Sequence, residues 1–340
     1  MTDPVLDTLC LPIEDGTIAL PHAGPALFLR ARTGDALRRL PRDGFLCQQS
    51  FKPAHDALVR DGFAVGEGGE TCDLAMVLPP RQREEGRALL VRAVRSTRDG
   101  GIVMAAASNL EGAKTVEGDL KRLAGHVTAV SKNKCRVFWA RIEAGRLDTA
   151  LADTWEAQDA PRRVADGLFL SRPGLFAWDH VDAGSRLLID TLPPGLKGCA
   201  ADLGAGFGYL SHEILTRYAG IAHLDVIEAE FRALDMARRN LSPFGDRASG
   251  YWLDATGPLP GAYDLIVSNP PFHIDRQDRH DLGQAFIRSA ARALAPGGSF
   301  WMVANRHLPY EDTLKAVFRS VETAAQTSAF KVFRATGAKA

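Results

Sequence analysis

Residues 264–271, DLIVSNPP, repeat a phrase that the chain already uses at residues 73–80, DLAMVLPP. The two phrases are 191 residues apart at both ends, and Leu78 stands where the second phrase has Asn269. A short apolar run that ends in prolines is typical of a buried strand followed by a turn. The pattern predicts two equivalent strands, one in each half of the chain, of which only the second ends in a polar side chain.

The repeat continues after this phrase. Three further pairs of segments match in the same order: 85–93 with 282–290, 100–101 with 297–298, and 129–140 with 324–335. A strand, a helix, a Gly-Gly pair, a second strand and a terminal hairpin therefore recur, which indicates a duplicated domain. Polar residues and Pro161 interrupt the pattern in EAQDAPRR, residues 156–163. We expect one domain at residues 1–160 and another at 161–340.

The second half shows the alternation that defines the fold class. Apolar and β-branched runs begin at residues 199, 223, 263 and 299, and helical patterns lie between them at 208–219, 230–241 and 282–295. This alternation predicts βαβ units and a mostly parallel sheet. Residues 321–336 have no helix between two extended pieces and predict a closing antiparallel hairpin. The expected fold class is α/β, with two tandem Rossmann-like domains.

Composition restricts the class of protein further. The chain has 340 residues, 46% hydrophobic and 24% charged residues and a formal net charge of zero, as in ordinary soluble globular proteins. No apolar run approaches the roughly 20 residues of a membrane helix, and the acidic N-terminus does not resemble a secretory signal. The five cysteines form no CxxC pair. We therefore expect a cytoplasmic protein with neither disulfides nor a bound metal.

Local charge is less even than the total. Arg92, Arg95 and Arg98 belong to a run of arginines at residues 81–98 that has few acids. Such a run is usually a solvated face. The alternative interpretation is a surface that contacts RNA phosphates without reading their sequence. We name these three arginines as candidate substrate-binding residues.

A glycine-rich loop marks the candidate cofactor site. ADLGAGFGYLSHEIL, residues 201–215, follows a predicted strand and opens a helix, where α/β sheets bind ligands at their carboxyl edge. Gly204, Gly206 and Gly208 allow a tight turn and a close approach to a ligand. A dinucleotide fingerprint would need its third glycine at the position of Tyr209, so the spacing argues against an NAD oxidoreductase.

Two acids follow at the next predicted strand ends. Glu228 lies 20 residues after Gly208, where a carboxylate can accept hydrogen bonds from both ribose hydroxyls. Asp254 ends the next predicted strand and could accept a hydrogen bond from an adenine amine. Each acid alone is more often a cap or a turn residue. Three successive strand ends that carry glycines, Glu and Asp favour a nucleoside-containing cofactor.

The fourth strand end carries the candidate chemistry, SNPPFH at residues 268–273. The two prolines stiffen the backbone around Asn269. The side-chain oxygen of Asn269 and the carbonyl of Pro270 can accept hydrogen bonds from both N–H groups of an exocyclic amine on a base, and Phe272 can stack on that base. This geometry suits transfer of a methyl group from a sulfonium to the amine. We name Asn269, Pro270, Pro271 and Phe272 as catalytic candidates and His273 as a base contact.

With these motifs in place, nearly the whole chain resembles the bacterial ribosomal RNA guanine-N2 methyltransferases of the RsmC type, within the class I S-adenosylmethionine-dependent methyltransferases. The segments LFLSRPGLFAWDHVDAGSRLLIDTLP, DLGAGFGYL, SNPPFH, LAPGGSFWMVAN, LPYEDTL and FKVFRA follow in family order. Members pair an inactive N-terminal methyltransferase-like domain with an active C-terminal one. The resemblance implies a monomer that methylates 16S rRNA or the small ribosomal subunit, with the first domain binding no cofactor and serving substrate docking or folding support.

The resemblance also assigns roles to individual residues. It implies that S-adenosylmethionine is bound by Asp202, the three glycines, Glu228, Asp254 and Asn269. The resemblance also places Ser171 and Asp182 near the cofactor. The link FAWDHVD between Gly174 and Ala183 is longer than the family's usual one, which weakens this assignment of the two residues.

Other functions share parts of this pattern. Adenine-N6 methyltransferases of RNA or DNA, and glutamine methyltransferases of release factors, use a similar Asn-Pro-Pro-aromatic stretch. A non-catalytic RNA-binding scaffold would not need Asn269. The duplicated first half and the Phe272-His273 continuation favour the ribosomal RNA enzymes.

Overall fold

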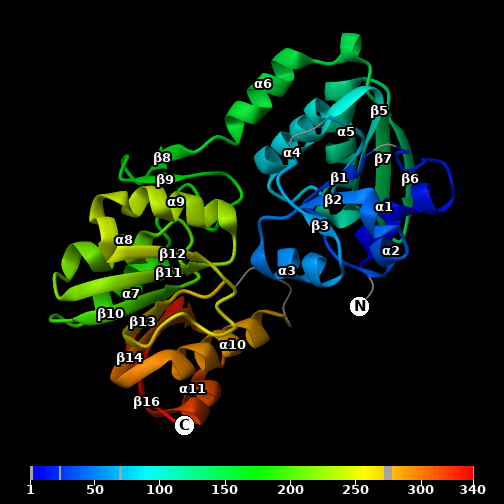
Figure 1. The fold of residues 1–340 in the computed structure, drawn as a ribbon. Coiled ribbons are helices and arrows are strands. Elements are labelled where there is room, and N and C mark those ends of the chain that lie inside the picture. The colour runs from blue at the N-terminus through cyan, green and yellow to red at the C-terminus, as the bar shows by residue number, and fades with distance from the viewer. Residues whose placement is uncertain (1–2, 23, 69–70, 272–277, 340) are drawn as a thin grey trace. The chain divides into compact units, whose positions relative to one another are not determined.

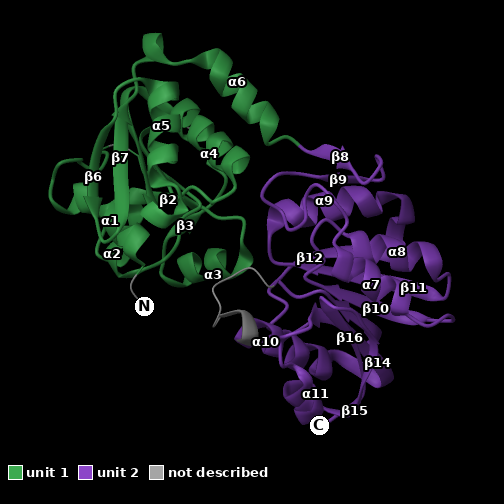
Figure 2. Cartoon of the chain, turned by 180° about the vertical axis from the view of Figure 1, so that it is seen from behind, with its two compact units in different colours: residues 1–160 green, residues 161–340 purple. Residues whose placement is uncertain are grey.

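The computed structural model describes residues 3–22, 24–68, 71–271 and 278–339. The chain divides into two compact units, residues 1–160 and 161–340 (Figure 2). A seven-stranded sheet forms the centre of each unit (Figure 1). Among the helices of the described residues, none combines the length and the apolar character needed to span a bilayer.

The sheet of the second unit has the strand order β12-β11-β10-β13-β14-β16-β15. Its strands are β10 (Gly198–Leu203), β11 (Ile221–Glu228), β12 (Ala248–Trp252), β13 (Tyr263–Ser268), β14 (Leu294–Asn305), β15 (Phe318–Gln326) and β16 (Phe330–Ala338). The pairs from β12 to β14 are parallel, and β16 is antiparallel to both β14 and β15. The predicted α/β class and the closing hairpin are confirmed.

Helices pack on both faces of this sheet because its strands are apolar on both sides. They are α7 (Ala183–Thr191), α8 (Tyr209–Arg217), α9 (Phe231–Leu241), α10 (Asp278–Ala293) and α11 (Glu311–Val317), with the 3-10 turn η4 (Ser242–Arg247). Leu265 and Val267 of β13 pack in one core with residues of α7, α8 and α9, while Ile266 packs in the other with Phe286 of α10. A small separate sheet pairs β8 (Arg162–Val164) with β9 (Phe169–Ser171).

The first unit repeats this arrangement strand for strand, with the order β3-β2-β1-β4-β5-β7-β6. Its strands are β1 (Ala26–Leu29), β2 (Phe45–Gln48), β3 (Ala64–Val65), β4 (Cys72–Val77), β5 (Thr97–Ser108), β6 (Thr128–Lys132) and β7 (Cys135–Arg141). Its helices are α1 (Pro4–Glu14), α2 (Asp35–Arg38), α3 (Lys52–Arg60), α4 (Arg83–Ser96), α5 (Ala113–Ala124) and α6 (Thr149–Gln158), with 3-10 turns η1 (Arg42–Gly44), η2 (Asn109–Glu111) and η3 (Ala144–Arg146). Two tandem domains of one topology are thus present, as predicted.

The recurring Gly-Gly pairs have the same structural cause in both units. Gly100 and Gly297 adopt φ values of +80° and +85°, in the left-handed region that favours glycine. A Cβ atom on Gly101 would lie 2.8 Å from the carbonyl oxygen of Asp73, and one on Gly298 would lie 2.6 Å from that of Tyr263. In both units the backbone of the long strand approaches the start of its neighbour too closely for a side chain.

One predicted boundary was wrong. The pattern indicated a helix to residue 295 and a strand from 299, but β14 begins at Leu294. The pairing of β13 with β14 shifts register between Tyr263 and Leu265, so Tyr263 pairs with Leu294 and Leu265 with Ser299. The Gly-Gly pair forms this irregularity, and the residues before it therefore rejoin the sheet.

Gly298→Ala should destabilise the second unit by about 1–3 kcal/mol, because the added methyl group has to displace a backbone carbonyl. Thermal unfolding with and without S-adenosylmethionine identifies the transition of this unit as the one the cofactor raises. Gly118→Ala is the control, since a Cβ at Gly118 meets no atom within 4 Å. An unchanged transition in Gly298→Ala would contradict the close-approach explanation.

Candidate active site

The predicted site residues of the second unit come from adjacent strand ends. Leu203, the last residue of β10, pairs with Ile227 of β11 and with Ser268 of β13. Gly204 directly follows β10, Asn269 directly follows β13 and Glu228 is the last residue of β11, so the three lie at one edge of the sheet. The chain leaves β10 toward β11 on one side and returns to β13 on the other, so this edge is a topological switch point, where open α/β sheets bind ligands.

The three glycines of the loop have different structural roles. All adopt positive φ, +73° at Gly204, +57° at Gly206 and +89° at Gly208. A Cβ on Gly208 would lie 3.1 Å from that of Ala237, so this glycine lets α8 pack closely on α9. At Gly206 a Cβ would meet no atom within 4 Å, so that face of the loop is open to a ligand. Gly204 and Gly206 line a small hollow, and Gly208 lies outside it.

Asp202 lies beneath this loop and is fully buried. The Ser211 hydroxyl donates to its Oδ2 at 2.6 Å, while its Oδ1 has no partner among the described residues. Burial raises the pKa of Asp202 to about 7, and the nearby Glu228 contributes to the rise. The carboxyl therefore sits under the candidate cofactor loop rather than on its open face.

Glu228 connects the end of β11 to the glycine loop. Its Oε2 accepts the backbone N–H of Gly206 at 2.7 Å, and its Oε1 accepts that of Glu230 at 2.8 Å. Desolvation raises the pKa of Glu228, although these two N–H groups oppose the rise. A carboxylate has about four acceptor positions, so Glu228 keeps capacity beyond these two bonds for a further donor.

Asp254 lies two residues beyond β12 and forms a local turn. Its Oδ1 accepts both the backbone N–H of Thr256 at 2.9 Å and the hydroxyl of Thr256 at 2.8 Å. This is the turn role expected of an isolated Asp. Its Oδ2 has no such partner among the described residues, and that oxygen is the one that could accept an adenine amine.

The side chain of Asn269 is held by the start of α7. Its Nδ2 donates to Asp182 Oδ2 at 2.8 Å and to Ser185 Oγ at 2.8 Å. The same carboxylate oxygen caps the helix by accepting the Ser185 backbone N–H at 2.8 Å. Because a carboxylate oxygen accepts hydrogen bonds, the amide nitrogen faces Asp182, and Oδ1, which has no partner among the described residues, can accept from another molecule.

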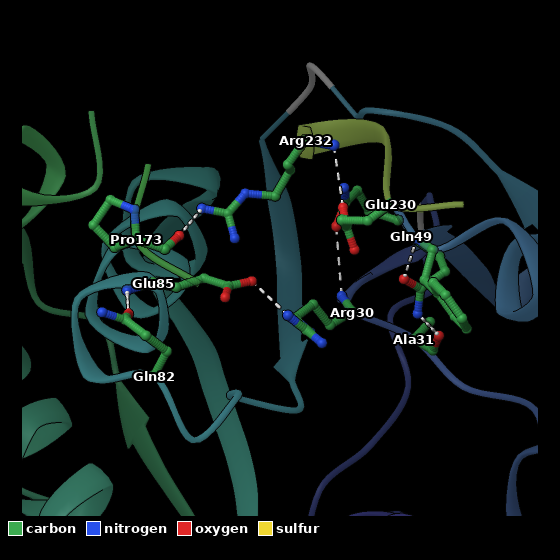
Figure 3. A network of polar contacts seen from close by, with 10 residues as sticks. Arg30, Ala31, Gln49, Gln82, Glu85, Pro173, Glu230 and Arg232 are labelled. Carbon is green, nitrogen blue, oxygen red and sulfur yellow. Dashed lines mark hydrogen bonds and ion pairs between the residues drawn. The ribbon is translucent and has the colours of Figure 1, made fainter. Parts of the chain in front are cut away.

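Sequence reasoning did not find this contact. Asp182 and Ser185 are more than 80 residues from Asn269 in the chain, and the local signal, DAGS at 182–185, reads only as a helix cap. The hollow beside them is also lined by Phe176 and Ala177 of the link before α7. A hydrogen bond of 3.1 Å from Arg232 Nη2 to the carbonyl of Pro173 fastens that link to α9 (Figure 3). Ser171, by contrast, is fully buried in β9.

The remaining catalytic candidates are described only in part. Pro270 is buried and Pro271 is partly buried, and a Cβ on Gly204 would lie 4.0 Å from Pro271 Cδ. The proline pair therefore runs beside the glycine loop. Phe272 and His273 lie outside the described residues.

The first unit has different groups at the matching positions. Strand register aligns Leu29 with Leu203, which places Arg30 at the position of Gly204, Gln49 at that of Glu228 and Leu78 at that of Asn269. Gln49 Oε1 accepts the N–H of Phe51 at 2.9 Å, as Glu228 accepts that of Glu230, but an amide has replaced the carboxylate. Leu78 is buried in the core and cannot accept a hydrogen bond.

Arg30 also changes the turn itself. It adopts a φ of +53°, a region usually left to glycine. Its guanidinium forms an ion pair with Glu85, a nearly buried residue whose backbone N–H donates to Gln82 Oε1 at 2.7 Å (Figure 3). A charged side chain thus occupies the position where the second unit has a bare backbone.

The three arginines predicted to contact RNA are all paired with carboxylates. Arg95 Nη1 and Nη2 bond to Glu156 and Asp153, Arg92 contacts Glu67 at 3.3 Å, and Arg98 pairs with Asp73. These acids lie far from the arginines in sequence. Pairing lowers the net positive charge that this surface offers to a phosphate backbone.

A glycine loop at a switch point, an acid at the end of the next strand and Asn-Pro-Pro after the fourth strand of this unit define a class I S-adenosylmethionine-dependent methyltransferase. Residues 166–334 match the family model of the methyltransferase small domain. Ribosomal RNA small subunit methyltransferase C of Serratia proteamaculans is 30% identical over 269 residues, 79% of this chain and 76% of that protein. The Escherichia coli (strain 55989) protein of that name is 31% identical over 265 residues, 78% and 75% of the two chains.

A solved structure agrees over nearly the whole chain. The T. thermophilus 16S rRNA N2 G1207 methyltransferase (RsmC), in complex with AdoMet and guanosine, superposes with a TM-score of 0.80 at 25% identity, covering 98% of this chain and 92% of that one. The chain belongs to the ribosomal RNA small subunit methyltransferase C family. The predicted family and the predicted cofactor, S-adenosylmethionine, are confirmed.

Asp202 should make the free energy of unfolding depend on pH. The folded protein keeps the Asp202 proton up to about pH 7, whereas the unfolded chain releases it near its ordinary pKa of 3.8, so this contribution decreases as the pH rises between those values. Asparagine does not titrate, so the unfolding free energy of Asp202→Asn minus that of the parent should rise from pH 5 to pH 8. The expected rise is more than about 1.4 kcal/mol, the free energy that corresponds to one pKa unit. Denaturant unfolding at both pH values measures it, with the exposed Asp312→Asn as control. A constant difference would contradict the assignment.

Asp182→Ala should lower kcat by about 10- to 100-fold, because the amide of Asn269 loses the acceptor that orients it. The S-adenosylmethionine-induced shift in melting temperature should persist. Asp182→Asn should recover part of kcat, since its side-chain oxygen can still accept. Asp179→Ala, in the same link, is the control. A loss confined to the KM for S-adenosylmethionine would contradict the positioning role.

Proposed function

We propose that this chain transfers a methyl group from S-adenosylmethionine to the exocyclic N2 amine of a guanine in 16S ribosomal RNA, as a monomer in the cytoplasm. The observation that carries the proposal is the fixed amide of Asn269, whose nitrogen is held by Asp182 and Ser185 and whose oxygen meets no donor among the described residues. Membership of the small subunit methyltransferase C family supports 16S ribosomal RNA as the substrate. The T. thermophilus relative, named for N2 of G1207, supports the guanine N2 atom as the position that is methylated.

The residues at the sheet edge fit the cofactor. Gly204 and Gly206 would border its methionine part, Glu228 would accept the ribose hydroxyls with its remaining acceptor capacity, and Asp254 Oδ2 would accept the adenine amine. Asp202 would act from beneath the loop by supporting its shape. When bound, S-adenosylmethionine supplies a methyl group activated by a positively charged sulfur.

The chain's own contribution is to position and polarise the amine. The lone pair of a guanine amine is delocalised into the ring, which makes the nitrogen a poor nucleophile. Asn269 Oδ1 and the Pro270 carbonyl would each accept a hydrogen bond from the amine and so hold its nitrogen toward the methyl group. As positive charge develops on nitrogen, these two oxygens stabilise it without reorganising, since the prolines and the Asp182 contact already fix them. The guanine has to leave its stack to reach this edge, and Phe272 would stack on it.

The first unit would bind no cofactor. Arg30, Gln49 and Leu78 replace the glycine, the carboxylate and the amide that such a site needs. We assign this unit to substrate docking or folding support. Within it, Arg92, Arg95 and Arg98 could engage phosphates only by exchanging their carboxylate partners, so we expect them to contribute weakly.

Asn269→Ala tests the function most simply. The variant should lose methyl transfer by at least about 100-fold, because the amine loses an acceptor that acts as charge develops, while S-adenosylmethionine should still raise the melting temperature. The substrate is 16S rRNA, free or in small subunits, from cells that lack this modification, and digested nucleosides are measured by mass spectrometry.

The exposed Asn109→Ala is the matched control and should leave transfer unchanged. N2-methylguanosine formed by the parent and absent from the Asn269 variant is the expected result. N6-methyladenosine in its place would support the adenine-N6 alternative, and full activity of Asn269→Ala would contradict the mechanism.

A further inference from the structure

A second feature of the catalytic edge lies at the end of β14. Ser268, the last residue of β13, pairs with Met302 of β14, and β14 continues to Asn305. Arg306 and His307 follow directly. At about 3.3 Å per residue along a strand and about 4.8 Å between strands, Arg306 lies roughly 11 Å and His307 roughly 14 Å from Asn269 on the same edge. This is close enough for a group attached to the reacting nucleotide or its neighbour.

These residues border an open groove of about 500 Å³. Its lining consists of Asn305, Arg306, His307, Ser328 and Ala329. The last two belong to the turn between β15 and β16, and the Arg306 backbone N–H donates to the Ala329 carbonyl at 2.8 Å. The turn is itself braced, because the Thr327 N–H donates to the Phe330 carbonyl at 2.8 Å. Two fixed pieces of backbone therefore form the groove.

The positive charge of Arg306 in this groove is not paired with a carboxylate of the described residues. Arg306 and His307 are exposed, and no carboxylate of the described residues lies within ion-pair distance of either. The cations nearby on β16 differ, since Lys331 pairs with Glu311 and Arg334 with Glu322. Arg92, Arg95 and Arg98 of the first unit are likewise paired. Arg306 thus offers its guanidinium to an external anion.

We propose that this groove binds the RNA backbone, with the Arg306 guanidinium on a phosphate next to the reacting guanosine and His307, Asn305 and the Ser328 hydroxyl as further hydrogen-bonding groups. The proposal rests on the proposed function, because only an RNA substrate places phosphates beside the target base. A planar guanidinium can donate two parallel hydrogen bonds to a phosphate, which anchors the strand without reading its sequence. The groove would hold the strand while its guanine lies at Asn269.

Arg306→Glu should weaken RNA binding about tenfold, the factor that corresponds to one charge-assisted hydrogen bond. The slope of log affinity against log salt should fall by about one, since one phosphate contact is lost. The kcat at saturating RNA and the S-adenosylmethionine-induced melting shift should remain those of the parent. Filter binding and initial-rate kinetics of the full chain with 16S rRNA provide these values.

Lys197→Glu makes the same charge change at the opposite edge of the sheet, just before β10, and should leave RNA affinity nearly unchanged. An Arg306→Glu variant with the parent's affinity and salt slope would overturn the proposal, as would an equal loss in Lys197→Glu. Failure of the proposed function looks different, because the parent itself would then form no N2-methylguanosine.

Discussion

The hydrogen bonds between Asp182, Ser185 and Asn269 are the constraint on which the catalytic edge depends. One carboxylate oxygen accepts both the N–H that begins α7 and the amide nitrogen of Asn269. The helix start and the end of β13 are therefore fixed by the same atom. Because Asp182 Oδ2 accepts the Asn269 Nδ2–H, it decides which end of the amide faces a substrate, and the two prolines decide the direction of the backbone. Positioning of this kind is what a weak amine nucleophile requires.

The two units show how little has to change for one sheet to gain or lose such a site. Both keep the strand order, the Gly-Gly approach and the antiparallel hairpin, which serve packing. The groups at the site differ at three strand ends: Arg30 for Gly204, Gln49 for Glu228 and Leu78 for Asn269. All three positions lie at the ends of strands, and Leu78 has joined the hydrophobic core of its unit, so the sheet keeps its order while the site changes. The Arg30–Glu85 ion pair even supplies the first unit with a partner for the charge that replaces its glycine.

Much of this could be predicted from the sequence, because the determining signals are local. Strand and helix periods, the glycine loop and the Asn-Pro-Pro stretch lie within short windows, and their order along the chain defines the sheet edge. What escaped prediction depends on contacts between distant residues: the Asp182–Asn269 bond, the acids that pair with Arg92, Arg95 and Arg98, and the packing role of Gly208 on α9. The start of β14 was misplaced because the Gly-Gly pair indicates a turn, whereas in the structure it forms a register shift inside the strand.

The central claim is that the Asn269 oxygen, oriented by Asp182, accepts a hydrogen bond from the reacting amine. A crystal structure of the full chain with guanosine and a non-transferable analogue of S-adenosylmethionine tests it directly. The account predicts the guanine N2 within hydrogen-bond distance of Asn269 Oδ1 and of the Pro270 carbonyl, with Asn269 Nδ2 still on Asp182. An N2 atom bound elsewhere, or an analogue held at the strand ends of the first unit, would contradict it.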